Sequence, residues 1–141
     1  MIIKQLSVFL ENKSGRLYEV SAILGKAGIN MSAFSVADTS EFGILRLIVS
    51  DHEQALKVLR EHNFSVNLTE VVCLNCPNQP GALARALQIL SENEVAIEYL
   101  YAFSVGDSAN VVIKPDHLEK CIDVLTLHSM ELVRASDLYR I

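Results

Sequence analysis

Two six-residue segments of the sequence carry residue types that could bind a charged small molecule. Each has the order asparagine, any two residues, glycine, any residue, leucine, at positions 12–17 and 78–83. Glycine permits a positive φ and lets a ligand approach the backbone closely. A helix that starts after such a turn offers unpaired N–H groups and the positive end of its dipole, which suit a carboxylate. The alternative is that Gly15 and Gly81 only complete tight turns.

A second group of reactive residue types lies around Cys73 and Cys76. Such a Cys-x-x-Cys pair can be a redox couple or half of a metal site. His117 and Cys121, four residues apart on one face of an expected helix, could complete four zinc ligands. However, Cys73 falls in an expected strand, where residues three apart point to opposite faces, and a redox pair normally opens a helix. We predict ordinary core or turn cysteines, with a zinc or thiol protein as the alternative.

The elements that must position these residues follow from hydrophobic periodicity. The first half predicts strand, helix, strand, strand, helix and strand at residues 2–10, 17–27, 29–37, 44–49, 51–60 and from 63 onward. The second half predicts the same order at residues 71–74, 80–93, 95–103, 109–113, 116–127 and 130–134. Asp51 with Gln54, and Asp116 with Glu119, have the spacing of capping boxes that open the second helix of each half.

The repeated order indicates duplication of a small domain. The turns lie 66 positions apart, and we infer that the shift becomes 65 later, where Asp51-His52 aligns with Asp116-His117. We therefore predict domains at residues 1–69 and 70–141, joined within a strand and without a Gly/Ser/Pro linker. The fold class is α+β: two ferredoxin-like βαββαβ units, each an antiparallel sheet with helices on one face.

Composition excludes several classes of function. The 141 residues carry a formal charge of -5 without a Lys/Arg cluster, which argues against nucleic-acid binding. Apolar runs fall short of the roughly 20 residues that cross a bilayer, and the start lacks a signal-peptide pattern. Three cysteines, an odd number, suit a reducing compartment, so we expect a cytoplasmic protein. The sequence has no Ser/His/Asp array, P-loop or dinucleotide-binding motif, so we predict no enzyme activity and no cofactor.

The turn motif, the amphipathic helix and the Gly28-Ile29-Asn30-Met31 segment together resemble the ACT domain, a small-molecule-binding regulatory module. The resemblance covers residues 1 to about 135. Members typically have proline before the glycine of the turn and a Gly-Ile/Val-Asn-Ile segment opening the second strand. The first repeat has Ser14 in place of that proline, and the second repeat has Glu94-Val95-Ala96-Ile97 in place of the later segment.

The resemblance implies binding of an amino acid or related effector at an interface between two ACT domains. There, the turn of one domain faces the opening of the second strand of the other. Carried over to this sequence, it nominates as ligand-binding residues Asn12, Lys13, Ser14, Gly15, Arg16, Leu17, Asn30, Met31, Ser32, Asn78, Gln79, Pro80, Gly81, Ala82, Leu83, Ala96, Ile97 and Glu98. Because Lys13 and Arg16 make only the first turn positive, two such sites would be inequivalent.

Together these observations predict a non-enzymatic sensor of an amino-acid-like effector. Its output would be an altered surface for an unidentified protein partner or an altered oligomer, and a homodimer would cover remaining sheet edges. The alternatives are an interaction module without a ligand, in which both turns are only structural, or the zinc or thiol protein described above.

Overall fold

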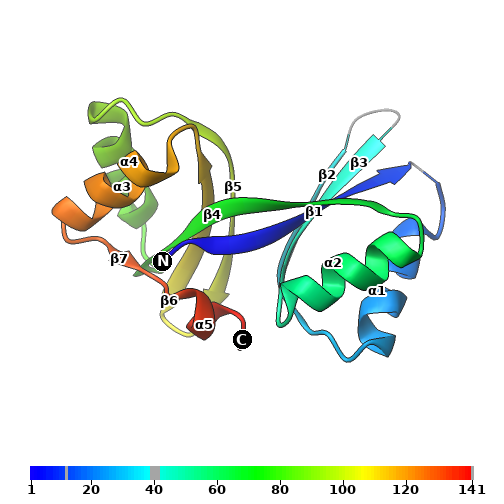
Figure 1. Cartoon of the computed structure of the whole chain (residues 1–141). Coiled ribbons are helices and arrows are strands. Elements are labelled where there is room, and N and C mark those ends of the chain that lie inside the picture. Colours follow the sequence, from blue (N-terminus) through cyan, green and yellow to red (C-terminus); the bar gives the residue numbers. More distant parts are fainter. Residues whose placement is uncertain (12, 39–41, 141) are drawn as a thin grey trace. The chain divides into compact units, whose positions relative to one another are not determined.

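The computed structural model describes the whole chain except residues 12, 39–41 and 141, and its element order confirms the duplicated pattern (Figure 1). The first half contains β1 (Ile3–Glu11), α1 (Arg16–Lys26), β2 (Met31–Asp38), β3 (Phe42–Val49) and α2 (His52–Glu61). The second half contains α3 (Ala82–Glu92), β5 (Ile97–Val105), β6 (Ser108–Pro115), α4 (Leu118–Leu127), β7 (Glu131–Leu132) and α5 (Ala135–Leu138). None of the described helices is long and apolar enough to span a membrane.

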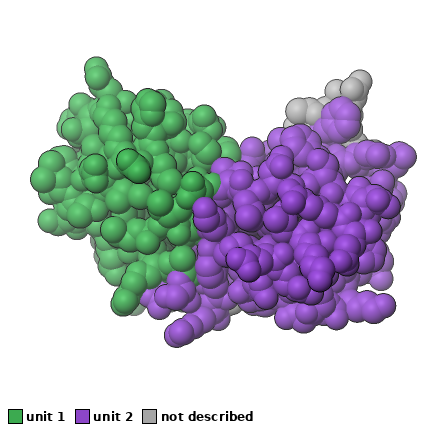
Figure 2. Space-filling view, viewed as in Figure 1, with its two compact units in different colours: residues 1–3, 70–135 green, residues 4–69, 136–141 purple. Residues whose placement is uncertain are grey.

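Between the two halves runs a single long strand, β4 (Ser65–Pro77), which replaces a linker. The chain divides into two compact units (Figure 2). The N-terminal unit, purple and labelled unit 2, contains residues 4–69 and 136–141. The C-terminal unit, green and labelled unit 1, contains residues 1–3 and 70–135. Strand β4 therefore contributes its first part to one unit and its second part to the other.

Each unit has the strand order expected for a ferredoxin-like arrangement. The order is β2-β3-β1-β4 in the N-terminal unit and β7-β4-β6-β5 in the C-terminal unit. The pairs β1–β3, β2–β3, β4–β6, β4–β7 and β5–β6 are all antiparallel. In the N-terminal unit α1 and α2 cover one face of the sheet, and α3 and α4 do so in the C-terminal unit (Figure 1). The predicted fold class is confirmed.

The two cores match position by position at a constant shift of 66 residues. Val20 and Leu24 of α1 correspond to the buried Ala86 and Leu90 of α3. Leu59 of α2 corresponds to Leu125 of α4, and both are fully buried. The predicted change to a shift of 65 is therefore wrong. The identical Asp-His dipeptides favour a shift of 65, but the buried positions of α2 and α4 correspond at a shift of 66.

The same register corrects one of the two predicted helix caps. Asp51 caps α2 as expected, since its carboxylate accepts a hydrogen bond from the Gln54 N–H at 3.1 Å. Asp116 does not cap α4, which has His117 at its N-cap and no side-chain cap. Instead, the Asp116 carboxylate accepts a hydrogen bond from the Ala96 N–H at 3.1 Å. It corresponds to Ser50, 66 residues earlier, whose hydroxyl accepts a bond from the Asn30 N–H at 3.0 Å.

The C-terminal tail, which the sequence pattern did not predict as an element, belongs to the N-terminal unit. Helix α5 has only four residues, and its last one, Leu138, is 0% exposed. The Tyr139 hydroxyl accepts a hydrogen bond from the Lys4 N–H at 3.0 Å, and its ring lies 5.6 Å from the His52 ring. One buried leucine and one tyrosine thus fix the tail to a unit that it does not follow in sequence.

We expect Leu138→Ala to lower the free energy of unfolding by about 2–5 kcal/mol, as large-to-small substitutions at fully buried positions do. Leu127→Ala is the matched control, because Leu127 is 81% exposed and its truncation should change stability by less than about 0.5 kcal/mol. Urea unfolding followed by circular dichroism measures both. Equal stability of the two variants would contradict docking of the tail.

Candidate functional site

The two predicted turns adopt nearly the same backbone conformation. Gly15 has φ 89° and ψ -9°, and Gly81 has φ 86° and ψ -11°, both in the left-handed region. Each carbonyl accepts the first helical hydrogen bond, from Glu19 at 2.9 Å and from Arg85 at 3.0 Å. The Arg16 N–H donates to the Lys13 carbonyl at 3.4 Å, and the Ala82 N–H donates to the Gln79 carbonyl at 3.2 Å. No side chain of the described residues caps either helix, so the next N–H groups of the first turn remain available to an anion.

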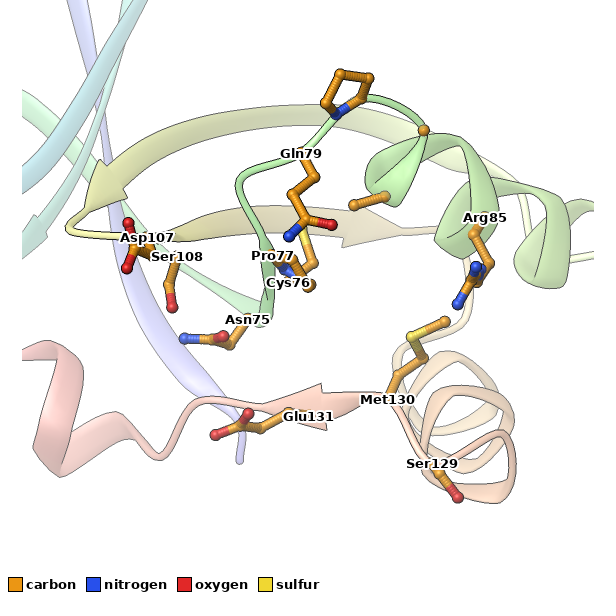
Figure 3. Close-up of a pocket in the computed structure, with 13 residues that line it drawn as sticks. Asn75, Cys76, Pro77, Gln79, Arg85, Asp107, Ser108, Ser129, Met130 and Glu131 are labelled. Carbon is orange, nitrogen blue, oxygen red and sulfur yellow. The ribbon is translucent and has the colours of Figure 1, made fainter.

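A cavity of about 620 Å³ lies beside the turn of the C-terminal unit (Figure 3). Three connections of the βαββαβ unit meet there: the β4–α3 turn, the β5–β6 hairpin and the α4–β7 turn. The Asn78 N–H donates to the Asp107 carbonyl at 2.9 Å, which ties the first two together. Residues that line the cavity are Asn75, Cys76, Pro77, Gln79, Pro80, Gly81, Ala82, Arg85, Asp107, Ser108, Ser129, Met130 and Glu131.

A smaller cavity, of about 220 Å³, occupies the equivalent place in the N-terminal unit. It is lined by Phe9, Leu10, Glu11, Arg16, Phe42, Asn63, Phe64 and Ser65. All eight positions, shifted by 66, line the larger cavity as Asn75, Cys76, Pro77, Ala82, Ser108, Ser129, Met130 and Glu131. The backbone fold therefore forms a cavity at the same end of both units, and the side chains determine the volume of each cavity.

In the N-terminal unit, neighbouring acids neutralise the predicted positive charge of the turn. The Lys13 ammonium lies 2.9 Å from the Glu11 carboxylate, and the Arg16 guanidinium lies 3.2 Å from Glu19 and 3.7 Å from Glu11. The hydrogen bond from Lys13, and then the charges of Lys13 and Arg16, lower the pKa of Glu11. Arg16 also lies 5.4 Å from the centre of the Phe64 ring. The side chains of Lys13 and Arg16, which the sequence analysis nominated as ligand-binding, therefore already contact other residues of the chain.

The second-strand openings nominated from the sequence lie at the opposite end of each unit from the turns. Ser32 and Glu98 occupy matching register irregularities at the starts of β2 and β5. The Glu98 carboxylate lies 3.1 Å from the Lys114 ammonium. Ala96 and Ile97 line a separate hollow with Leu87 and Ser91, whereas Asn30 and Met31 line neither cavity. Within one unit, the structure therefore does not bring turn and strand opening together.

The structure places five of the twelve nominated turn residues at the cavities. Gln79, Pro80, Gly81 and Ala82 line the larger one, and Arg16 lines the smaller one. Neither of these two cavities is lined by Lys13, Ser14, Gly15 or Asn78 of the turns, or by Leu17 of α1 or Leu83 of α3. Asn12 lies outside the described residues.

Arg85, Asp107, Ser108 and Glu131 are among the polar residues of the larger cavity that the prediction from sequence missed. They lie on a helix, a hairpin and a strand start that share no motif with the turn. A comparison at the constant 66-residue shift would have found two of them, because Glu19 and Phe42 give way to Arg85 and Ser108.

The cysteines lie in surroundings that oppose zinc or redox chemistry. Cys76 and Cys121 belong to the core of the C-terminal unit, where they correspond to Leu10 and Ala55. Burial raises the pKa of Cys73 to about 12, and burial with the charge of Asp116 raises the pKa of Cys121 to about 11. Among the residues that the structure describes, no three His, Cys, Asp or Glu side chains are placed to hold a metal ion.

We expect stability to fall at alkaline pH because of these thiols. Below pH 9.0, their ordinary pKa, folded and unfolded chains both keep the thiol protons. As the pH rises from there toward 12, the unfolded chain loses protons that folded Cys73 still holds, so the free energy of unfolding decreases. Urea titrations at several pH values measure this, and Cys73→Ala with Cys121→Ala should flatten the curve relative to the unsubstituted chain. A double variant with an unchanged slope would contradict the assignment.

Gly81→Ala should destabilise the chain by about 1–2 kcal/mol, since an L-residue pays this much in the left-handed region. No atom lies within 4 Å of the added Cβ, so the effect comes from the backbone alone. Gly25→Ala, inside α1 and equally free of contacts, is the control and should stabilise by about 0.5–1 kcal/mol. The same sign for both substitutions would contradict the assigned conformation.

Comparison with known proteins agrees with this architecture. A family model described as ACT domain pair matches residues 1–141. The crystal structure of protein BT0572 from Bacteroides thetaiotaomicron has 53% identity and a TM-score of 0.97, with 100% of this chain and 98% of that chain covered. The ligand-free regulatory subunit of aspartate kinase from Thermus thermophilus has 15% identity and a TM-score of 0.64, with 88% and 91% covered.

The corresponding subunit from Thermus flavus has 14% identity and a TM-score of 0.63, with 90% and 94% covered. None of the curated proteins matches. At such low identity the two aspartate kinase subunits share the fold, whereas the family model covers the whole sequence. The chain therefore belongs to the ACT domain pair family of regulatory modules.

Proposed function

We propose that this chain is a non-enzymatic sensor that binds an amino acid or a related small effector through its ACT domains. The turn of one ACT domain, facing the second-strand opening of another, would hold the effector. The proposal keeps all the nominated residues of the turns and strand openings, and it keeps the domain limits at residues 1–69 and 70–141.

One observation carries the proposal: the left-handed glycine turn of the C-terminal unit opens onto a cavity. Gly81 begins α3 without a side-chain cap and lines a space of about 620 Å³. Binding sites for small molecules commonly measure about 300–1,000 Å³, so an amino acid fits with room for water. Family membership supports a regulatory role.

The output of the sensor follows from the same argument. A regulatory module without a catalytic set acts by changing a surface, so we propose a homodimer or an unidentified protein partner that responds to the effector. Three free thiols among 141 residues favour a reducing compartment, and we propose the cytoplasm.

Isothermal titration calorimetry against the twenty standard amino acids tests this function. We expect at least one to give saturable heat and to raise the melting temperature, since a ligand at 100 times its Kd stabilises the folded state by about 2.7 kcal/mol. Light scattering with and without that amino acid then reports a change in oligomeric state. Absence of heat and of thermal shift for all twenty would refute the sensor.

A module that binds a protein partner without any effector is the competing function. The N-terminal turn, whose cations already contact Glu11 and Glu19, favours that reading for its own unit. Gly15→Ala and Gly81→Ala separate the two functions. Loss of amino-acid response in Gly81→Ala, with the oligomer retained, supports sensing.

A further inference from the structure

We propose that a groove at the start of α4 is a docking site for a protein partner, which inserts a tyrosine or phenylalanine that has an arginine or lysine beside it. This α4 groove is lined by Ile2, Glu70 and residues 116–120, has a volume of about 630 Å³ and lies wholly in the C-terminal unit. The inference rests on the partner-binding part of the proposed function and deepens it, but it does not require that an effector binds.

The α4 groove offers apolar surface to an inserted ring. Ile2 precedes β1, Glu70 lies in β4, and residues 116–120 form the β6–α4 connection and the first turn of α4. Ile2 is 39% exposed, and Leu118 is half-buried against the core of the C-terminal unit. An aromatic side chain that covers these two residues buries a large area and keeps its polar edge at the rim.

The N-terminal unit has the equivalent position, and an aromatic ring occupies it. At the 66-residue shift, Glu70 corresponds to Lys4 and Leu118 corresponds to His52. Both counterparts contact Tyr139 of the tail: the Lys4 N–H donates to the Tyr139 hydroxyl at 3.0 Å, and the His52 ring lies 5.6 Å from the tyrosine ring. The chain itself therefore shows which kind of side chain fits the start of the second helix of a unit.

One tail cannot occupy two equivalent positions at once. Residues 136–141 belong to the N-terminal unit, and the described part of them, residues 136–140, does not line the α4 groove. A ring for the second position must come from another molecule. In a second copy of the chain the same tail is already docked, with Leu138 fully buried, so a different protein is the occupant that we expect.

The charges around the α4 groove favour a basic residue beside the ring. The groove has more acidic than basic lining residues: Glu70, Asp116 and Glu119 against Lys120. Complementary charge selects partners and speeds their association, so this lining favours a cationic segment. The tail has the matching order, since its tyrosine is followed by the exposed Arg140. Aromatic residues and arginine are also the types that contribute most at protein interfaces.

Titration of the full chain with a synthetic peptide of residues 134–141, followed by NMR of the backbone amides, tests the site. The peptide carries the tyrosine and the arginine of the tail. We expect it to shift the amide signals of residues 117–120 in a saturable way. A peptide with Tyr139→Phe should bind with a similar Kd, and a peptide with Tyr139→Ala should bind at least tenfold more weakly, because it lacks the ring.

Two variants of the chain test the lining. Ile2→Asp places a charge against the inserted ring, and Glu119→Arg repels the arginine of the peptide, so each should weaken peptide binding about fivefold or more. Both residues are exposed, and circular dichroism confirms that each variant is folded. Leu127→Asp and Glu61→Arg are the matched controls, because both residues are exposed on helices without lining the α4 groove, and the Kd should stay unchanged.

Three results would overturn the docking site. The first is an absence of shifts at residues 117–120. The second is shifts confined to the surroundings of Lys4 and His52, which would mean that the peptide only displaces the tail from the N-terminal unit. The third is equal binding of the peptide with Tyr139→Ala. Equal weakening by Glu119→Arg and Glu61→Arg would overturn the basic residue, since it would reflect net charge alone.

Further measurements separate the partner from a second copy and from the effector. Light scattering of the chain alone reports self-association; a dimer that is lost in both Ile2→Asp and full-length Tyr139→Ala would assign the α4 groove to the tail of another copy and overturn the partner. Ile2→Asp should bind amino acids like the unsubstituted chain. If no amino acid binds but the peptide does, the effector proposal fails and the docking site stands.

Discussion

The left-handed glycine between the first strand and the first helix is the constraint on which both units depend. At φ 89° and 86°, Gly15 and Gly81 reverse the chain within a few residues, so that each helix returns along the sheet that precedes it. A side chain at either position would raise the energy of that conformation by about 1–2 kcal/mol. In the C-terminal unit, Gly81 and the following Ala82 also line the larger cavity.

Most of the fold was predictable because hydrophobic periodicity is a property of each element alone. The buried positions of α1 and of α3 lie four residues apart, and the hairpins are marked by polar or glycine-containing turns. The role of Asp116 and the position of the tail were not predictable in this way. Asp116 bonds a residue 20 positions away, and α5 has too few residues to show a helical period. Both depend on tertiary contacts.

The residues of the candidate site also fall into a predictable and an unpredictable group. The turn around Gly81 could be predicted because its residues are adjacent in sequence. Arg85, Asp107 and Glu131 could not, because only the βαββαβ topology brings a helix, a hairpin and a short strand to one end of the unit. The nominated Ala96, Ile97 and Glu98 illustrate the converse, since that topology places strand openings at the other end. A motif search therefore lacks one kind of information: which loops lie at the same end of the folded unit.

Duplication explains why two cavities with the same lining positions differ in chemistry. The exposed pairs of Arg16 with Glu11 and Glu19 contribute little to stability, since surface ion pairs are worth about 0–1 kcal/mol. Their larger effect is on binding: a ligand carboxylate would have to displace an intramolecular one that is already close. Replacing Arg16 by alanine and Glu19 by arginine, as at positions 82 and 85, removes that competitor and frees the cation. One backbone thus accommodates paired charges at the first turn and a different set of charged residues beside the second.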